Sequence, residues 1–318
     1  MVTLPKTTNL KLLFLFLDGV GLGIDDAANN PFAATSMPNL ENLLGGMRML
    51  SLDSDEIIQS ELATLVSLDA CLGVDGRPQS ASGQASLLSG INVAKILGQH
   101  YGPKPNPEII KILGNGNLFR ELGEIGYQSA LLNAFPRQYF EAIESGRRLP
   151  GAIAMAALKA NIELKTIDDL MSGRAISADF TGQGWVDHLQ YSCTPVLTTA
   201  EAGVRLAELS KLYVFSLFEF WISDLIGHRR EHIAASECLS TFDQVLGSLV
   251  STWDHDRGLI LVTSDHGNLE DLSTRKHTRN PVPALVIGDQ ALRHRFIQDL
   301  RDLSDITPAI LRFFKEES

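Results

Sequence analysis

The sequence predicts an α/β layered fold with a parallel or mostly parallel sheet. Short, continuously apolar runs, typical of strands buried on both faces, alternate with stretches whose apolar residues recur at helical spacing. This alternation favours strand–helix–strand connections. The chain has 318 residues, of which 44% are hydrophobic, so it can bury a large core as two domains, or as one large domain that carries an insertion.

The individual elements follow from these two patterns. Five apolar runs are predicted strands: residues 12–17, 129–134, 212–218, 258–264 and 283–288. Four stretches are predicted helices: residues 116–126, 199–210, 232–253 and 303–314. In the last helix Asp305 would act as the cap, and Pro308 is tolerated in the first turn.

One segment lacks the alternation of apolar runs and amphipathic stretches seen in the rest of the chain. Residues 135–200 contain small helices and turns but no clear strand. We therefore expect a core made of residues 1–134 and 201–318, with residues 135–200 as a small insertion or cap on it.

Charge and cysteine content narrow the choice of partners. The formal net charge of −11 disfavours nucleic acid and anionic membranes, which attract basic surfaces. Three widely spaced cysteines support neither a disulfide framework nor a thiolate zinc site, and they favour a reducing cytoplasm. The apolar run 10–17 is too short to span a bilayer and lacks a signal-peptide cleavage site. The sequence does not indicate an oligomeric state.

Metal-binding side chains follow three predicted strands, and ligands collect at the carboxyl ends of strands in such sheets. Asp18 ends the first strand, and the glycines after it lack the helix that a dinucleotide site requires. Asp224 and His228 are four residues apart, which places them on one face of a helical turn, with His232 extending the row. Taken alone, this pattern fits a solvated helix start with Asp224 as its cap.

Two further segments strengthen the metal interpretation. Asp265 and His266 follow the run 258–264, and both can serve one site only if the chain turns there, as "GN" at 267–268 predicts. His277 precedes the last predicted strand and would return to the same sheet edge. Three carboxylates and three imidazoles suit Zn²⁺ or Mn²⁺, and six ligands exceed what one zinc ion needs. We therefore expect two divalent ions.

A serine-rich segment supplies a candidate nucleophile. Residues 76–92 place Ser80, Ser82, Ser86 and Ser89 at the start of an expected helix, where backbone N–H groups favour negative charge. Ser80 or Ser82 could instead be a simple helix cap. Two-metal sites commonly stabilise the attacking and leaving oxygens of a phosphoryl displacement.

Taken in order, these segments resemble the alkaline phosphatase superfamily. The motifs are "FLDGVG", "NPFAATSMPNLENLL", "QSASGQ", "DLIGHRRE", "TSDHGNLED", "KHTRNPVP" and "LSDITPAIL". They are most similar to the metal-dependent mutase branch, which contains cofactor-independent phosphoglycerate mutase and phosphopentomutase. The resemblance covers roughly residues 11–135 and 200–315 and implies a three-layer α/β/α core with a small inserted cap.

The resemblance also implies roles for individual residues. One metal would be held by Asp224, His228 and His277, and the other by Asp18, Asp265 and His266. Ser80 would bind a metal and be the phosphorylated nucleophile. The implied activity is that of a phosphatase or phosphomutase acting on a small phosphorylated substrate.

The chain departs from the mutases at two places. Gln84 stands where both mutases carry a histidine, and the inserted region is much shorter than the substrate-binding domain of phosphoglycerate mutase, which disfavours that particular activity. A non-catalytic or regulatory metal-binding homologue is the main alternative. A sulfatase or phosphodiesterase ranks lower, because "QSASGQ" lacks the sulfatase proline and arginine. In the insertion, Arg147, Arg148 and Arg174 are possible phosphate contacts, although surface arginines are often only solvated.

Overall fold

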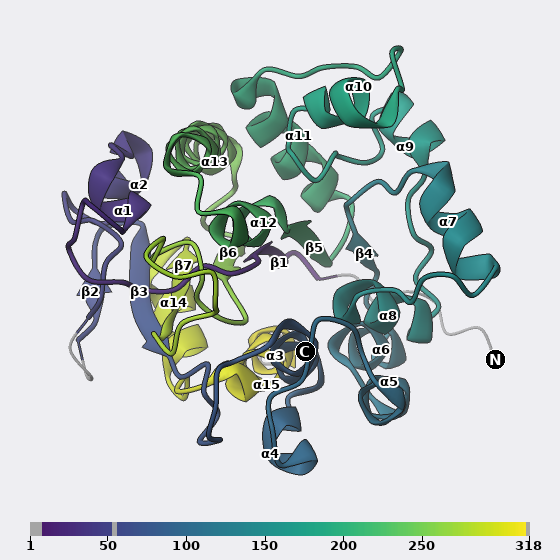
Figure 1. The fold of residues 1–318 in the computed structure, drawn as a ribbon, viewed down its shortest axis with the longest axis horizontal. Coiled ribbons are helices and arrows are strands. Elements are labelled where there is room, and N and C mark those ends of the chain that lie inside the picture. The colour runs from purple at the N-terminus through teal and green to yellow at the C-terminus, as the bar shows by residue number, and fades with distance from the viewer. Residues whose placement is uncertain (1–7, 53–55, 316–318) are drawn as a thin grey trace.

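The computed structural model describes residues 8–52 and 56–315 and has three layers, with one sheet between two groups of helices (Figure 1). The seven strands lie in the order β2-β3-β7-β6-β1-β5-β4. Their bounds are β1 Lys11–Leu17, β2 Ile58–Gln59, β3 Ala63–Leu68, β4 Ser129–Leu131, β5 Phe215–Phe220, β6 Gly258–Thr263 and β7 Val282–Ile287. The predicted α/β class and three-layer architecture are confirmed.

The sheet is mostly parallel. β1 pairs in parallel with β5 and β6, and β4 pairs in parallel with β5. β7 runs antiparallel to β6, β3 antiparallel to β7, and β2 antiparallel to β3. Only β2 and β7 therefore oppose the other described strands, which brings the start of β7 to the edge where β6 ends.

Alternating side chains of the central strand face the two helical layers. Leu12, Phe14 and Phe16 of β1 belong to one core cluster, and Leu13 and Leu15 belong to the other. The first cluster is covered by helices α3 Ser80–Ser89, α4 Val93–Leu97, α5 Pro107–Asn115, α6 Leu118–Glu124, α8 Ala152–Lys159, α14 Gln290–Ile297 and α15 Ile306–Lys315. The second is covered by α1 Pro31–Ala34, α2 Pro38–Leu43, α11 Thr199–Lys211 and α13 His232–Thr252.

All five strands and four helices expected from the apolar patterns are present, with shifted ends. The hairpin β2–β3 was missed, because β2 has only two residues and Thr64 and Ser67 interrupt the apolar pattern of β3. The expected cap of the last helix is corrected. Asp302 caps a 3₁₀ turn, η1 Leu303–Asp305, while the carboxylate of Asp305 reaches back to the N–H groups of Arg301 and Asp302.

The segment 135–200 forms short helices beside the β4 end of the sheet (Figure 1). Besides α8, these are α7 Arg137–Glu144, α9 Ile167–Met171 and α10 Gln183–Leu189. Ala152, Ile153 and Ala156 of α8 lie in the first core cluster, whereas Leu170 and Trp185 belong to a small separate cluster. The division of the chain at residues 134 and 200 stays a prediction.

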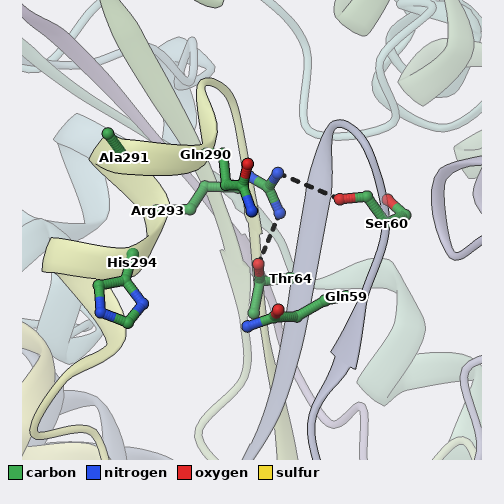
Figure 2. A pocket seen from close by; sticks show the side chains of 7 residues that line it. All are labelled: Gln59, Ser60, Thr64, Gln290, Ala291, Arg293 and His294. Atoms are coloured by element: carbon green, nitrogen blue, oxygen red, sulfur yellow. Dashed lines mark hydrogen bonds between the residues drawn. The ribbon is translucent and has the colours of Figure 1, made fainter.

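A buried arginine joins α14 to the β2–β3 hairpin. Figure 2 shows the guanidinium of Arg293 between Ser60 and Thr64, where it donates to the Ser60 carbonyl oxygen and to Thr64 Oγ1. It also donates to the carbonyl oxygens of Glu61 and Gly288. A cavity of about 530 Å³ opens here, and none of its lining residues is a candidate metal ligand. Within residues 8–52 and 56–315, none of the helices combines the length and the hydropathy that a membrane span requires.

Candidate metal centre

Four chain segments meet at one edge of the sheet. Asp18 follows β1, Asp265 follows β6, and Asp224 lies in the first turn of α12 Ile222–Arg229, directly after β5. His277 precedes β7, and it reaches the same edge because β7 is antiparallel to β6. Sheet topology therefore brings together residues that are up to 259 positions apart in the sequence, from Asp18 to His277.

The side chains at this edge form two overlapping groups. Ligand atoms of Asp18, Asp265 and His266 all lie within 4.8 Å of one another, and so do those of Asp224, His266 and His277. His266 Nε2 lies 3.5 Å from Asp18 Oδ1 and 3.6 Å from Asp265 Oδ2. The stacked rings of His266 and His277, with centroids 3.7 Å apart, join the two groups.

His228 borders the second group and is the most exposed of the six. Its Nε2 lies 3.3 Å from Asp224 Oδ2 and 3.2 Å from His277 Nε2. His228 Nδ1 is 2.9 Å from the Arg275 carbonyl oxygen, and His277 Nδ1 is 2.8 Å from that of Pro78. A carbonyl oxygen only accepts, so each Nδ1 donates. Two Nε2 atoms that face each other beside a carboxylate suit a bound cation.

Electrostatics point the same way. Burial, followed by the charges of Asp265 and Asp224, raises the pKa of Asp18 well above its usual value. Burial and then Asp224 raise the pKa of Asp265 to about 8. Burial lowers the pKa values of His266 and His277, which keeps both rings neutral. Asp18 Oδ1 is buried and has no hydrogen-bond partner in the described part of the chain. Crowded carboxylates, neutral imidazoles and an unsatisfied oxygen fit divalent cations.

Of the four candidate serines, only Ser80 borders the carboxylates and imidazoles. It is the first residue of α3, and its Oγ lies 3.0 Å from His266 Nε2. Ser82 Oγ binds the backbone of Gln79 and Tyr101, while Ser86 and Ser89 donate to carbonyl oxygens of their own helix. The helix-cap alternative is wrong for Ser80 and Ser82, because the cap position is Gln79.

Gln84 contacts both carboxylates of the first group. It lies one helical turn after Ser80, is buried, and its Nε2 is 3.0 Å from Asp265 Oδ2 and 3.4 Å from Asp18 Oδ2. The sequence marked this position as a departure from the mutases but gave it no role. The spacing of four residues from the candidate nucleophile was the available signal.

Comparison with known proteins now decides the family. The family model described as "Metalloenzyme superfamily" matches residues 10–317. The chain belongs to this superfamily. This match confirms the resemblance of the motifs to the alkaline phosphatase superfamily. It also confirms that the chain belongs to a family of metal-binding enzymes.

Curated relatives of this metalloenzyme are 2,3-bisphosphoglycerate-independent phosphoglycerate mutases. That of Rhodopseudomonas palustris is 32% identical over 137 residues, which cover 39% of this chain and 26% of the relative. That of Acetivibrio thermocellus is 31% identical over 121 residues, which cover 35% and 24%. The match therefore spans about a quarter of each relative.

Solved structures support the fold. PH0037 protein from Pyrococcus horikoshii aligns with a TM-score of 0.53 at 16% identity, over 90% of this chain and 86% of that one. Leishmania mexicana phosphoglycerate mutase, solved at low cobalt concentration, aligns with a TM-score of 0.50 at 13% identity, over 98% and 97%. At these identities the likeness concerns the architecture alone.

A buried carboxylate that the sequence analysis missed holds the loops of the metalloenzyme together. Glu270 Oε2 accepts from the N–H groups of Gly21 and Asn268, at 3.0 and 2.8 Å, and Oε1 accepts from Thr278 Oγ1 and Asn280 Nδ2. Gly21 lies in the loop that follows β1, whereas the other three donors lie with Glu270 in the single connection between β6 and β7. Glu270 therefore fixes the segments that carry Asp18, Asp265 and His277.

Two expectations about neighbouring residues need correction or refinement. His232 does not lie on the same helix face as Asp224 and His228, because α12 ends at Arg229 and the cap residue Arg230 has a φ of +59°. His232 starts another helix, with its side chain exposed. Among the arginines of the insertion, Arg174 pairs with Asp169 at 3.0 Å.

Proposed function

We propose that this metalloenzyme is a two-metal-dependent phosphoryl-transfer enzyme acting on a small phosphorylated metabolite through a phosphoserine at Ser80. The observation that carries the proposal is the position of Ser80 Oγ, 3.0 Å from the histidine that belongs to both candidate ligand groups. A hydroxyl at that point supports the proposed role of Ser80 as the nucleophile.

The donor set indicates how two cations would be held. Asp224, His228 and His277 would bind one, and Asp18, Asp265 and His266 the other, with Ser80 as a further ligand. Mixed oxygen and nitrogen donors favour Mn²⁺ or Zn²⁺. Bound cations would supply charge neutralisation on the phosphoryl oxygens and a lower pKa for the serine hydroxyl.

The chain itself supplies the nucleophile and part of the anion site. Ser80 Oγ would form the bond to phosphorus as the bond to the leaving oxygen breaks. Ser82 N–H donates to the Tyr101 carbonyl oxygen, but the N–H groups of Ser80 and Ala81 have no partner among the described residues. At the positive end of the ten-residue helix α3 they would stabilise the phosphoryl oxygens.

The second step decides between two versions of this activity. Attack by water on the phosphoserine would make a phosphatase, whereas attack by a substrate hydroxyl would make a mutase. The named relatives favour the mutase version, while the short region 135–200 and Gln84 favour the phosphatase version. We propose a cytoplasmic location for either.

Mass spectrometry of the intact protein tests the proposal. Mn²⁺- or Zn²⁺-loaded protein, incubated with a panel of phosphate esters and sugar phosphates, should gain one phosphoryl group that maps to Ser80. Ser80→Ala should lose the adduct, and Ser89→Ala, a buried serine of the same helix, should keep it. Phosphorus NMR would separate released phosphate from an isomerised ester. Metal-loaded protein that forms no adduct and turns over none of the panel would support a non-catalytic binding protein instead.

A further inference from the structure

A half-buried glutamate lies beside the candidate metal ligands, on the side of the insertion. Glu219 of β5 pairs in register with Phe16 of β1, and Asp18 follows two residues later. Phe16 belongs to the core cluster on the α3 side, so Asp18 and Glu219 point from adjacent strands to that same side. The backbone of Glu219 is held by the side-chain amide of Asn133, through two hydrogen bonds of 2.8 Å.

Lys104 approaches this place from the loop after α4. The loop is fastened to the start of α3, because Tyr101 exchanges hydrogen bonds of 2.8 and 2.9 Å with Ser82. A Cβ atom on Gly102 would lie 3.2 Å from the backbone nitrogen of Ser80. The ammonium of Lys104 lies 3.9 Å from the Cβ position of Gly151, at the start of α8. Lys104 therefore extends between the nucleophile's helix and the insertion.

Arg148 completes the cluster from the insertion. Its guanidinium lies over the ring of Tyr139, 5.0 Å from the centroid, and that ring packs against Phe135 at 4.5 Å. An arginine on an aromatic face keeps its N–H groups directed outward. The adjacent Arg147 instead donates from Nε to Ser145 Oγ.

The charges in this cluster do not cancel. Burial and then the neighbouring Arg148 lower the pKa of Lys104, while burial raises the pKa of Glu219 to about 7 against the opposing effect of both cations. Neither cation forms an ion pair with any described residue. Two cations thus lie near one carboxylate, and such an excess of positive charge suits an anionic ligand.

We propose that Lys104 and Arg148 bind a second anionic group of the substrate, at the end away from the phosphoryl group. The favoured substrates are phosphorylated metabolites that also carry a carboxylate or another phosphate. Glu219, on the same side, would accept hydrogen bonds from hydroxyl groups between the two ends. This inference rests on the proposed function for the position of the phosphoryl group at Ser80.

A binding experiment with two matched phosphonates tests this inference without turnover. Isothermal titration of metal-loaded protein would compare 2-carboxyethylphosphonate with propylphosphonate, which has a similar length but no carboxylate. Wild-type protein should bind the carboxylate ligand at least tenfold more tightly, a difference of about 1.4 kcal/mol. The ratio of the two affinities should fall below threefold in Lys104→Met and in Arg148→Met. It should persist in Lys104→Arg and in Arg147→Met, the matched control.

Three results would overturn the inference. Equal affinities of the two phosphonates for wild-type protein would do so, as would the absence of binding by either. If the methionine variants bound both phosphonates more weakly by the same factor, Lys104 and Arg148 would bind the phosphoryl group itself. Failure of the proposed function is seen separately, as a missing adduct on Ser80 in protein that still prefers the carboxylate ligand.

Discussion

Replacing Gln84 with leucine tests how the two buried carboxylates tolerate each other without metal. The 3.0 Å bond from Gln84 Nε2 to Asp265 has ordinary geometry, and the 3.4 Å bond to Asp18 is long. A hydrogen bond to a charged group contributes about 1.5–3 kcal/mol, and the long bond should add less than about 1 kcal/mol. We expect Gln84→Leu to lower the unfolding free energy of metal-free protein by about 2–3 kcal/mol where Asp265 is ionised.

The effect should depend on pH in a defined direction. The pKa of Asp265 is raised to about 8, so the folded state holds a proton that the unfolded state releases near pH 4, and its stability falls as pH rises through that window. The Gln84 bond opposes the rise, so its removal steepens the fall. At pH 6, where Asp265 is mostly protonated, the loss should shrink to about 1 kcal/mol, the contribution of a neutral hydrogen bond.

Urea denaturation with EDTA at pH 6 and pH 9 measures both values. Saturating Mn²⁺ should reduce the loss at pH 9, because bound cations compensate the carboxylates. Ser89→Ala, which removes a buried hydroxyl of the same helix, should cost the same at both pH values. A loss for Gln84→Leu that is equal at pH 6 and pH 9, or larger at pH 6, would refute the reasoning.

Three further predictions concern the metal ligands, the loops and the helix packing. At a concentration 100 times the wild-type Kd, Mn²⁺ should stabilise wild-type protein by about 2.7 kcal/mol, measured as a thermal shift. The same concentration should stabilise His277→Ala less than half as much, and equal stabilisation would contradict a role of His277 as a metal ligand. Glu270→Gln should cost about 2–4 kcal/mol in urea denaturation, because an amide NH₂ would face backbone donors; an unchanged midpoint would contradict this. Gly203→Ala should cost about 1–3 kcal/mol, since its Cβ would lie 2.7 Å from Leu249 N, whereas Gly123→Ala, with nothing within 4 Å, should be neutral or stabilising.

The types of candidate metal ligand and their local spacing could be predicted from the sequence. Asp224 and His228 share a face of α12 because four residues make about one helical turn. Asp18 and Asp265 end buried strands whose apolar runs are continuous. These features depend on neighbours along the chain, so periodicity and composition suffice to predict them.

Contacts between distant segments needed the folded chain. His277 was expected at this sheet edge, but no pattern in the sequence indicated that β7 is antiparallel to β6, the direction that brings His277 to the end of β6. Gln84 was noticed only as a departure, because its contacts with Asp18 and Asp265 depend on how α3 lies across the sheet. The carboxylate of Glu270 likewise joins the β6–β7 connection to Gly21, which lies 249 positions away in the sequence.

The sequence by itself thus determined the layered α/β class, most of the elements and the types of side chain available for a metal centre. Each of these depends only on local periodicity and on the chemistry of the residues. Only the tertiary structure decided which of those side chains converge, which serine lies beside them, and that Lys104 and Arg148 form no ion pair with the described residues. Distances and local charge depend on strand order, direction and helix packing, which a single chain's spacing does not encode.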